Sequence, residues 1–295
     1  MSKEEVRQAV GPARREGGMI ALVPTMGALH EGHLSLVRAA RSRADVVAVS
    51  IFVNPTQFGA GEDLAAYPRD LDRDLGLLSG EGVDFVFTPS PETMYAPDAA
   101  TVVDPGVIGT MLEGAVRPGH FQGVATVVTK LLAIIAPDLA CFGEKDYQQL
   151  LVVRRLVRDL DLPVTIVACE TVREIDGLAL SSRNTYLSPA ERAAAPSLYR
   201  SLSEAVRRAE RGEPAVAALE RTMRDAAAHE PALTLDYAVI ADEATLEPLT
   251  ALPLGMRARA LISGRIATTH LIDNVAIVGG DLKPAWQKYG SALGE

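Results

Sequence analysis

Two histidines separated by a glycine stand where a chemical site is expected. The stretch from 23 to 34 reads VPTMGALHEGHL and contains His30, Gly32 and His33. An apolar run before it predicts a strand, and the residues after it predict a helix. Ligands of parallel α/β sheets bind beyond the carboxyl ends of strands, and a helix N-terminus offers unpaired N–H groups to phosphate. Imidazole donors held there would stabilise negative charge that develops on phosphoryl oxygens.

The spacing of this loop argues against two common sites. Gly27 and Gly32 have the glycine spacing of a P-loop, but His33 and Leu34 replace the lysine and the hydroxyl residue that the motif needs. A zinc protease needs HExxH, whereas this sequence has HExH without a third ligand nearby. We therefore expect no protein-held metal here. Taken alone, the motif is also compatible with two histidines that lie near a helix start for no chemical reason.

Three other polar segments could contribute to the same site. Asn54 and Gln57 follow the second predicted strand, and their amides suit hydroxyl and carboxylate groups. Lys145 suits phosphate oxygens, and Asp146 either caps a helix or accepts from a ribose hydroxyl. The segment 181–183 joins two serines to an arginine in a short polar break between the predicted domains, and this position suggests a lid. In isolation, each segment also has an alternative interpretation without chemistry. The first is compatible with a solvated turn, the second with a capped helix start, and the third with a linker.

Four remaining residues are less informative. Arg117 and His120 lie in a predicted loop before a long apolar helix, and direct substrate contact by them stays open. His229 and His270 have no polar constellation around them, which indicates structural or exposed residues.

Predicted strands and helices alternate along the part of the chain that must position these residues. Apolar runs at 19–23, 46–53, 84–88, 138–142 and 163–168 predict strands, and helical spacing occurs at 33–43, 70–78, 124–135 and 147–158. Continuous apolar strands between helices indicate a parallel α/β sheet. We expect a Rossmann-like domain over 1–171 and a smaller α+β lid domain over 172–295. In the latter, two helices between 189 and 229 precede strands at 235–241, 258–263 and 268–278.

Composition narrows the class of protein. The 295 residues carry a formal charge of −9, which argues against broad binding to nucleic acid. Cys141 and Cys169 lie in apolar runs without metal-ligand spacing, as expected for buried filler in a reducing compartment. The N-terminus has no signal-like apolar region, and no apolar run has the length of a membrane span. We expect a cytoplasmic protein.

The string PTMGALHEGH resembles the pantothenate synthetase (pantoate:beta-alanine ligase) family of the HxGH nucleotidyltransferase superfamily. Matching segments follow in order: FVNPTQFG at 52–59, RPGHFQGVATVVTKLL and FGEKDYQQL between 117 and 150, and LSSRNTYLS at 180–188. The tail after Val278 matches no element of the family.

This resemblance implies an enzyme that condenses pantoate with beta-alanine through a pantoyl adenylate, releasing AMP and pyrophosphate. It implies ATP as co-substrate, Mg²⁺ held mainly by ATP, and a homodimer. The implied catalytic residues are His30, His33, Lys145 and Arg183. The residues expected to contact ATP are Met26, Gly27, Ala28, Leu29, His30, Glu31, Gly32, His33, Gly143, Glu144, Lys145, Asp146, Val172, Leu180, Ser181, Ser182 and Arg183. Those expected to contact the acid and the amine are Met26, Asn54, Gln57 and Gln149.

Two rival functions use the same loop. A nucleotidyltransferase acting on a phosphorylated acceptor would need more basic residues than Gln57 and Gln149 provide. A nucleotide-binding regulatory module without turnover would not need both imidazoles together with Lys145 and Arg183.

Overall fold

The computed structural model describes residues 2–280, which form two compact units. The first unit contains residues 2–173 and 180–185, and the second contains 174–179 and 186–280. A single boundary near residue 171 was predicted, but the chain crosses between the units three times. The segment 180–185 packs with the first unit because Arg183 pairs with Asp63, and the hydroxyl groups of Ser182 and Tyr67 share a hydrogen bond.

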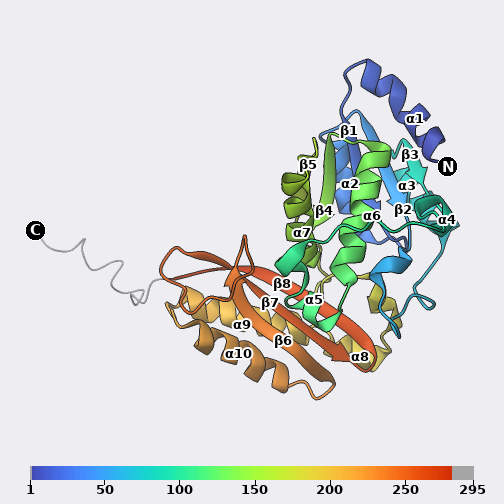
Figure 1. Cartoon of the computed structure of the whole chain (residues 1–295). Helices are drawn as coiled ribbons and strands as arrows, with labels where there is room; N and C mark the ends of the chain where they lie inside the picture. The colour runs from blue at the N-terminus through green and yellow to red at the C-terminus, as the bar shows by residue number, and fades with distance from the viewer. Residues whose placement is uncertain (1, 281–295) are drawn as a thin grey trace, which may run out of the picture. The chain divides into compact units, whose positions relative to one another are not determined.

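The first unit is built on a five-stranded parallel sheet (Figure 1). In spatial order its strands are β3 (Phe85–Phe87), β2 (Val46–Ile51), β1 (Ile20–Thr25), β4 (Leu139–Gly143) and β5 (Thr165–Cys169). All five were predicted. The chain builds outward from β1 in one direction and then returns to β4 on its other side, so the strand order reverses beside β1. Ligand sites of open α/β sheets lie at such a reversal, outside the carboxyl ends of the strands.

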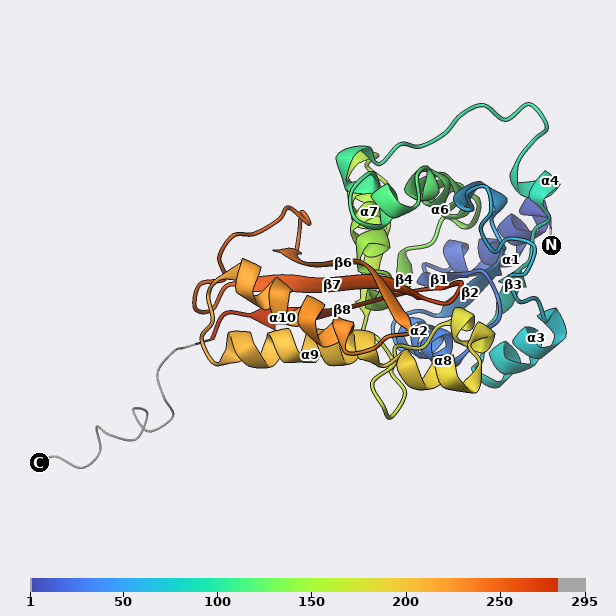
Figure 2. The same cartoon turned by 90° about the horizontal axis from the view of Figure 1, so that it is seen from below.

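Helices cover both faces of this sheet. Figure 2 shows α2 (Glu31–Arg41) and α3 (Leu71–Gly80) on one face, and α6 (His120–Ile135) and α7 (Tyr147–Asp159) on the other. These helices were predicted, but α6 begins at His120, which is therefore helical and not part of a loop. The shorter elements of this unit are η1 (Pro55–Gln57), α4 (Pro91–Met94), η2 (Gly106–Gly109), α5 (Glu113–Val116), η3 (Glu144–Asp146) and the start of η4 (Ser182–Tyr186).

An N-terminal helix was missed. Helix α1 (Lys3–Arg15) begins with a capping box, in which Ser2 Oγ accepts from the N–H of Glu5 and the Glu5 carboxylate accepts from the N–H of Ser2. This reciprocal arrangement satisfies two donors that a helix start otherwise leaves unpaired. Val6 and Val10 are its buried residues, so a narrow apolar face anchors the helix.

Helix α3 presents a different face to the core from the one that its leucines predict. Leu71 and Leu75 are 44% and 38% exposed, whereas Leu78 is 1% exposed. Asp74, one turn before Leu78, is also only 1% exposed. The buried face of α3 therefore combines an apolar residue with a carboxylate, and the carboxylate contacts the loop that contains the two histidines.

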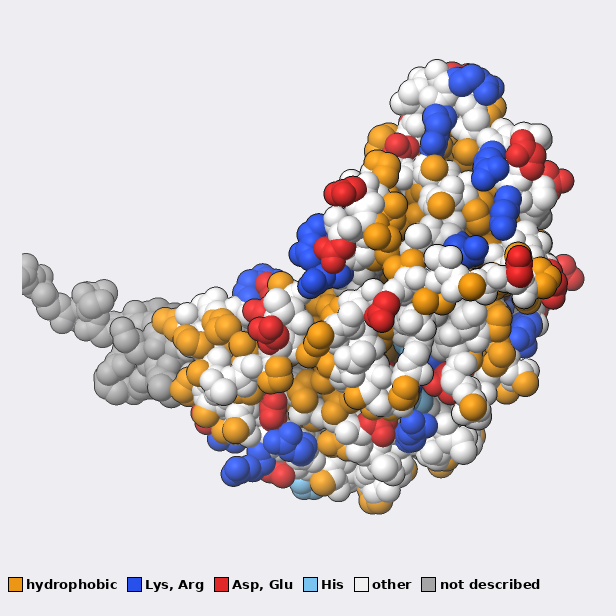
Figure 3. Space-filling view, in the orientation of Figure 1, with side chains coloured by type: hydrophobic (Ala, Val, Ile, Leu, Met, Phe, Trp, Pro, Cys, Tyr) orange, Lys and Arg blue, Asp and Glu red, His pale blue; other side chains and the backbone are white. Residues whose placement is uncertain are grey.

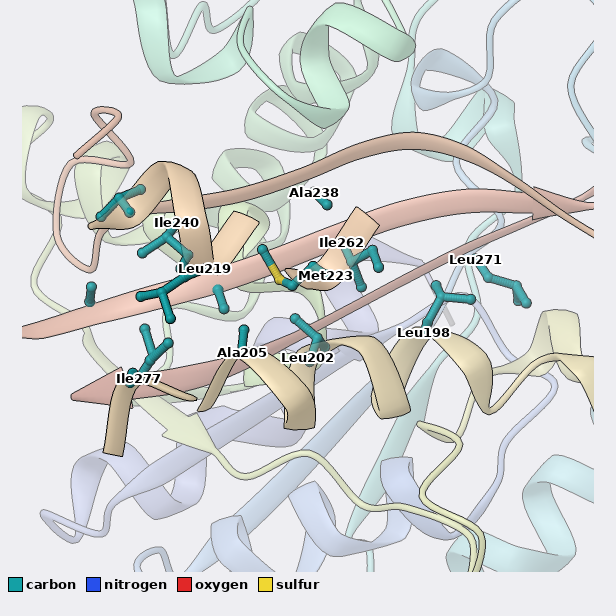
Figure 4. Close-up of a cluster of buried hydrophobic side chains, with 14 of the residues drawn as sticks. Leu198, Leu202, Ala205, Leu219, Met223, Ala238, Ile240, Ile262, Leu271 and Ile277 are labelled. Carbon is teal, nitrogen blue, oxygen red and sulfur yellow. The ribbon is translucent and has the colours of Figure 1, made fainter. Parts of the chain in front are cut away.

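The second unit is an antiparallel sheet with two helices against one face. The strands β6 (Leu233–Asp242), β7 (Arg257–Ile266) and β8 (Thr269–Val278) lie in that order, and all were predicted. Leu202 and Ala205 of α9 (Ser197–Glu210) and Leu219 and Met223 of α10 (Val216–Ala228) pack on the sheet (Figure 4). The first of the two helices expected between 189 and 229 is divided, because a separate helix α8 (Pro189–Ala194) comes before α9. The capping box of α8 begins at Ser188, whose side chain accepts from the N–H of Glu191.

Two further expectations concern the ends and exterior of the chain. Most of the unmatched tail, residues 281–295, lies outside the described residues. Within the described part, no helix has both the length and the apolar character that crossing a membrane requires. Figure 3 shows acidic and basic side chains interspersed over the face in view, with no large region of one sign.

Candidate active site

A pocket in the first unit opens at the carboxyl ends of the parallel strands. Its wall includes Thr25 at the end of β1, Phe52 after β2, Gly143 at the end of β4 and Thr171 after β5. The topology therefore brings together loops that are far apart in sequence. This is the edge of the sheet at which the polar segments were expected to meet.

Most of the predicted site residues line this one pocket. They are Met26, His30, Gly32, His33, Asn54, Gln57, Gly143, Lys145, Asp146, Gln149, Val172, Leu180, Ser181, Ser182 and Arg183. Arg117 and His120, whose roles stayed open, line it as well. Five residues that were expected to contact ATP are not among those that line this pocket: Gly27, Ala28, Leu29, Glu31 and Glu144. The N–H groups of Ala28 and Leu29 are already used, because both donate to Asp74.

The two motif histidines pack against each other, with tilted rings, at the start of α2. His30 is the N-cap residue, with extended backbone angles, and its ring centroid lies 4.1 Å from that of His33. The backbone N–H of His30 donates to Nδ1 of His33 at 3.4 Å. Since Nδ1 of His33 accepts, the proton of a neutral His33 ring is on Nε2. Nδ1 of His30 is buried and has no hydrogen-bond partner among the described residues.

Both imidazoles are neutral near pH 7. Burial and the nearby Lys145 charge lower the pKa of His30 to about 4. Burial and the neighbouring His30 lower the pKa of His33 to about 3. Each ring therefore offers one N–H donor to a ligand and carries no charge of its own. The positive charge of this part of the pocket comes from Lys145.

Gly32 lies against the His30 ring. A Cβ atom at Gly32 would lie 3.0 Å from both Nδ1 and Cε1 of His30, which is tighter than most contacts of a Cβ atom. A larger residue between the histidines would therefore press on this imidazole. This contact gives a steric reason for the glycine in the HxGH motif.

A hydrogen-bond network orients the Gln57 amide. Asn54 is 1% exposed, and its Nδ2 donates to Oε1 of Gln57 at 3.0 Å and to the carbonyl of Gly123 at 3.2 Å. Its Oδ1 accepts from Thr56 Oγ1 and from the Tyr95 hydroxyl, at 2.9 and 2.8 Å. With Oε1 of Gln57 engaged, its Nε2 is the donor end of the amide, and it donates to Met26 Sδ at 3.1 Å. Asn54 is thus placed to orient Gln57, which is more specific than the substrate contact that was predicted.

Gly123 allows this network to form. A Cβ atom at Gly123, in α6, would lie 2.3 Å from the carbonyl oxygen of Thr56 and 2.7 Å from the backbone nitrogen of Gln57. Helix α6 therefore packs directly on the backbone of η1. The sequence contains this glycine within the motif RPGHFQG, but its steric role was not predicted.

Arg117 and His120 support the backbone of Gln57. Arg117 forms a paired contact with Glu62, at 2.9 and 2.6 Å, and Nδ1 of His120 donates to the Gln57 carbonyl at 2.8 Å. Burial and the Arg117 charge lower the pKa of His120 to about 4, so its Nε2 is free to accept from Arg117 at 3.2 Å. These two residues therefore hold the wall of the pocket at Gln57.

Lys145 and Asp146 lie in η3, directly after β4. Lys145 Nζ is 3.5 Å from Asp146 Oδ1, and both residues line the pocket. Although burial raises it, the charges of Lys145 and Arg183 hold the pKa of Asp146 below its ordinary value. Asp146 stands at the N-cap of α7 but makes no side-chain cap hydrogen bond. Of the two roles considered for it, helix capping is therefore not used.

Arg183 is anchored to the first unit through Asp63. Its Nε and Nη2 donate to the two carboxylate oxygens of Asp63, both at 2.9 Å. The Tyr67 ring lies 6.0 Å from the guanidinium, and the Tyr67 hydroxyl is 3.3 Å from Ser182 Oγ. One edge of the Arg183 fork is thus occupied by protein. Neither Asp63 nor Tyr67 was predicted, because the stretch 60–67 has no recognisable motif.

An apolar wall completes the pocket and was also missed. It is formed by Phe52, Val124, Val127, Val128, Leu131 and Phe142. In the sequence these residues have the spacing of core-facing positions, and nothing in that pattern separates a core residue from one that lines a pocket.

Comparison with known proteins agrees with this geometry. The profile of the family described as Pantoate-beta-alanine ligase matches residues 1–276. Pantothenate synthetase of Brucella anthropi is 52% identical over 93% of this chain and 94% of its own. The structure of pantothenate synthetase from Thermus thermophilus superposes with a TM-score of 0.87 at 49% identity, covering 93% of this chain and 97% of the other.

A second solved structure bears on the ligands of the family. Pantoate-beta-alanine ligase of Francisella tularensis, complexed with beta-gamma ATP and beta-alanine, superposes with a TM-score of 0.74 at 35% identity. The match covers 92% of this chain and 95% of that one. With a profile match over most of its length and relatives above half identity, this chain belongs to the pantoate-beta-alanine ligase family.

Proposed function

We propose that this chain joins pantoate to beta-alanine in the pocket of its first unit, with ATP as co-substrate. In the first step a pantoate carboxylate oxygen attacks the α-phosphorus of ATP, the bond to the β-phosphate breaks, and pyrophosphate leaves. In the second step the beta-alanine amine attacks the acyl carbon, the bond to AMP breaks, and the amine loses a proton to solvent. Activation is needed because a free carboxylate is a poor electrophile. The observation that carries this proposal is the convergence of His30, His33, Lys145, Gln57 and Gln149 on one pocket.

The phosphoryl end of the pocket is the one that contains the histidines. Two neutral imidazoles offer preorganised N–H donors, and the first N–H groups of α2 have no partner within the helix. Such donors stabilise charge as it develops on the α-phosphoryl oxygens, and each is worth about 3 kcal/mol of barrier. Lys145 would supply a point charge to the same oxygens. We assign the catalytic roles to His30, His33, Lys145 and Arg183.

The pantoate end of the pocket combines an amide with an apolar wall. The Gln57 amide, held by Asn54, would donate from Nε2 to the carboxylate or a hydroxyl of pantoate, and Gln149 lines the same pocket. Pantoate carries two methyl groups on one carbon. Val127, Val128 and Phe52 provide an apolar surface that suits this carbon, so the pocket favours a branched hydroxy acid over an unbranched one.

The carboxylates near the pocket fit a magnesium ion that arrives with ATP. Glu62 and Asp63 are paired with arginines, and among the described residues no three histidines, cysteines or acids are grouped to hold a metal. Asp146 and Glu170 line the pocket and would reach such an ion or its waters. When bound, Mg²⁺ would neutralise phosphate charge, with most of its ligands from ATP and water.

Four further expectations remain proposals. They are the Rossmann-like character of the first unit, the second unit as a lid, a homodimer and a cytoplasmic location. The alternative of nucleotidyl transfer to a phosphorylated acceptor is not favoured, because the family match points to the ligase.

Isotope exchange tests the two-step route. With pantoate and Mg²⁺ present and beta-alanine absent, the enzyme should exchange labelled pyrophosphate into ATP. Beta-alanine alone should support no exchange, since its amine has no adenylate to attack. Exchange that requires beta-alanine, or ADP as the main product, would contradict the proposed route.

A further inference from the structure

Asp74 is a buried carboxylate that contacts the histidine loop from a neighbouring helix. Its Oδ2 accepts from the N–H of Ala28 and its Oδ1 from the N–H of Leu29, both at 2.8 Å. Arg73 lies on the other side, with Nη1 3.6 Å from Oδ1, and also donates to the Leu29 carbonyl at 3.0 Å. A carboxylate removed from water is destabilising unless it is paired in this way. The buried Asp74 carboxylate thus depends on the loop for hydrogen-bond donors, and the loop amides depend on Asp74 for an acceptor.

The loop has a backbone conformation that needs such support. Gly27 and Ala28 have φ angles of 81° and 50°, in the left-handed region that residues other than glycine avoid. Oδ2 of Asp74 lies 3.1 Å from the place that a Cβ atom at Gly27 would occupy, so the carboxylate packs against this turn. Without Asp74, two partly or fully buried N–H groups would lose their acceptors, and Ala28 would remain in an unfavourable conformation.

The backbone amides of Ala28 and Leu29 lie directly before the first of the two histidines. Leu29 precedes His30, the N-cap of α2, and His33 is held by the His30 backbone. The strand before the loop is fixed by the sheet, and α2 after it is fixed by the core residues Leu34 and Val37. Asp74 accepts two hydrogen bonds from the loop between them, and it forms no hydrogen bond with either histidine.

We infer that Asp74 is a positioning residue for adenylate formation, and that it acts by fixing the Ala28–Leu29 turn so that His30 and His33 face the α-phosphate. The inference rests on the proposed function, because it concerns the step in which those imidazoles act. It explains why a carboxylate occupies the buried face of α3, and it assigns a role in the reaction to a residue outside the pocket wall.

Asp74→Asn tests this inference with little change in volume. The amide can accept from one N–H but turns its own NH₂ group toward the other, so the turn should shift. Misplacement by about 1 Å can reduce a rate on the order of 100-fold. We expect the kcat of pyrophosphate exchange to fall on the order of 10- to 100-fold, with the KM values for ATP and pantoate changed by less than about threefold.

Asp138→Asn is the control for the loss of a carboxylate acceptor away from the histidine loop. Asp138 Oδ2 accepts from the N–H of Ile20 at 2.8 Å, at the opposite end of β1. Both variants should lose thermal stability, whereas the selective loss of kcat should occur only in Asp74→Asn. Equal kcat in both variants at matched folded fraction would overturn the inference. Absence of pantoate-dependent exchange in the wild type would instead overturn the proposed function.

A second variant covers the case in which Asp74→Asn does not fold. Asp74→Glu keeps the charge and both acceptors but moves them along a longer side chain, so the turn should be displaced without an unpaired N–H. We expect a folded protein with lowered kcat and nearly unchanged KM values. Wild-type kcat in a folded Asp74→Glu variant would show that the exact position of the turn is immaterial, and would overturn the inference.

Discussion

Nδ2 of Asn54 donates to Oε1 of Gln57 at 3.0 Å, and this single bond determines which end of the Gln57 amide faces the pocket. Asn54 cannot reverse its own amide, because its Nδ2 donates to the Gly123 carbonyl and its Oδ1 accepts from the backbone N–H of Thr56. These two backbone groups therefore fix the donor and acceptor ends of Asn54, and Asn54 in turn fixes those of Gln57. Nε2 of Gln57 donates one hydrogen to Met26 Sδ and has a second to donate, as recognition of an acid requires.

Asn54→Asp should weaken pantoate binding through its effect on the Gln57 amide. The substitution keeps the size of the side chain but replaces its donor with an acceptor, which repels Oε1 of Gln57 and favours rotation of that amide. A hydrogen bond lost in this way is worth roughly 1 to 3 kcal/mol, so KM for pantoate should rise by about 10-fold or more.

Two companion variants sharpen this measurement. Gln57→Ala should raise the KM for pantoate at least as much as Asn54→Asp does. Tyr95→Phe should have a smaller effect, because Asn54 Oδ1 keeps its contact with Thr56. Unchanged pantoate kinetics in Asn54→Asp would show that the orientation of Gln57 does not matter for acid recognition.

Gly32→Ala should impair the first step by moving one imidazole. The added methyl group would lie 3.0 Å from His30 Nδ1 and Cε1, so the ring must rotate or shift. We expect slower pyrophosphate exchange with unchanged KM for pantoate. Gly76→Ala in α3 is the control, since a Cβ atom there meets nothing within 4 Å and alanine favours a helix by about 1 kcal/mol. A wild-type exchange rate in Gly32→Ala would show that the position of the His30 ring does not affect the first step.

Sequence reasoning predicted the parallel strands well, because their continuous apolar runs reflect burial on both faces. It failed on α3, where the leucine spacing indicated an apolar face that is in fact half-exposed at Leu71 and Leu75. The buried Asp74 could not be found from the pattern, since an acidic residue in a helix is usually exposed. Only the tertiary fold brings its carboxylate to Ala28 and Leu29.

The site shows the same division between local and tertiary information. Motifs identified His30, His33, Gln57 and Lys145, which line one pocket, because each follows a strand whose carboxyl end faces the same edge. The partners of these residues were not predictable. Asp63 lies 120 residues from Arg183, and only the folded chain brings them into contact.

The lowered histidine pKa values predict two pH effects. Near pH 7 both motif imidazoles are neutral, and their pKa values of about 4 and about 3 place their protonation well below neutrality. The exchange rate should therefore show no loss from protonation of His30 or His33 between pH 8 and 6.

In the unfolded chain these histidines titrate near about 6.5. Stability is thus fully present above that value and is lost as the pH falls from about 6.5 toward 4 and 3.

Comparing the melting temperatures at pH 7 and pH 5 measures this loss. In His33→Gln, which cannot be protonated, the decrease between the two pH values should be smaller than in the wild type. An equal decrease would show that His33 is not a source of the acid sensitivity.

The Arg183–Asp63 pair allows a phosphate role for Arg183 to be separated from an anchoring role. If Arg183 contacts the phosphates, Arg183→Lys should lower the exchange kcat, because an ammonium lacks the planar fork that makes paired contacts. Asp63→Asn weakens the same ion pair but leaves the guanidinium in place, and it removes an anion that occupies Nε and Nη2. We therefore expect Asp63→Asn to retain most of the exchange activity and Arg183→Lys to lose most of it.

If anchoring of the 180–185 segment were the whole role of Arg183, both variants should lose activity to the same extent. The double variant should then be no worse than either single one, as expected for two residues that act only through their mutual contact. Initial exchange rates of the three variants at saturating ATP, with folding checked by thermal melts, distinguish the two roles.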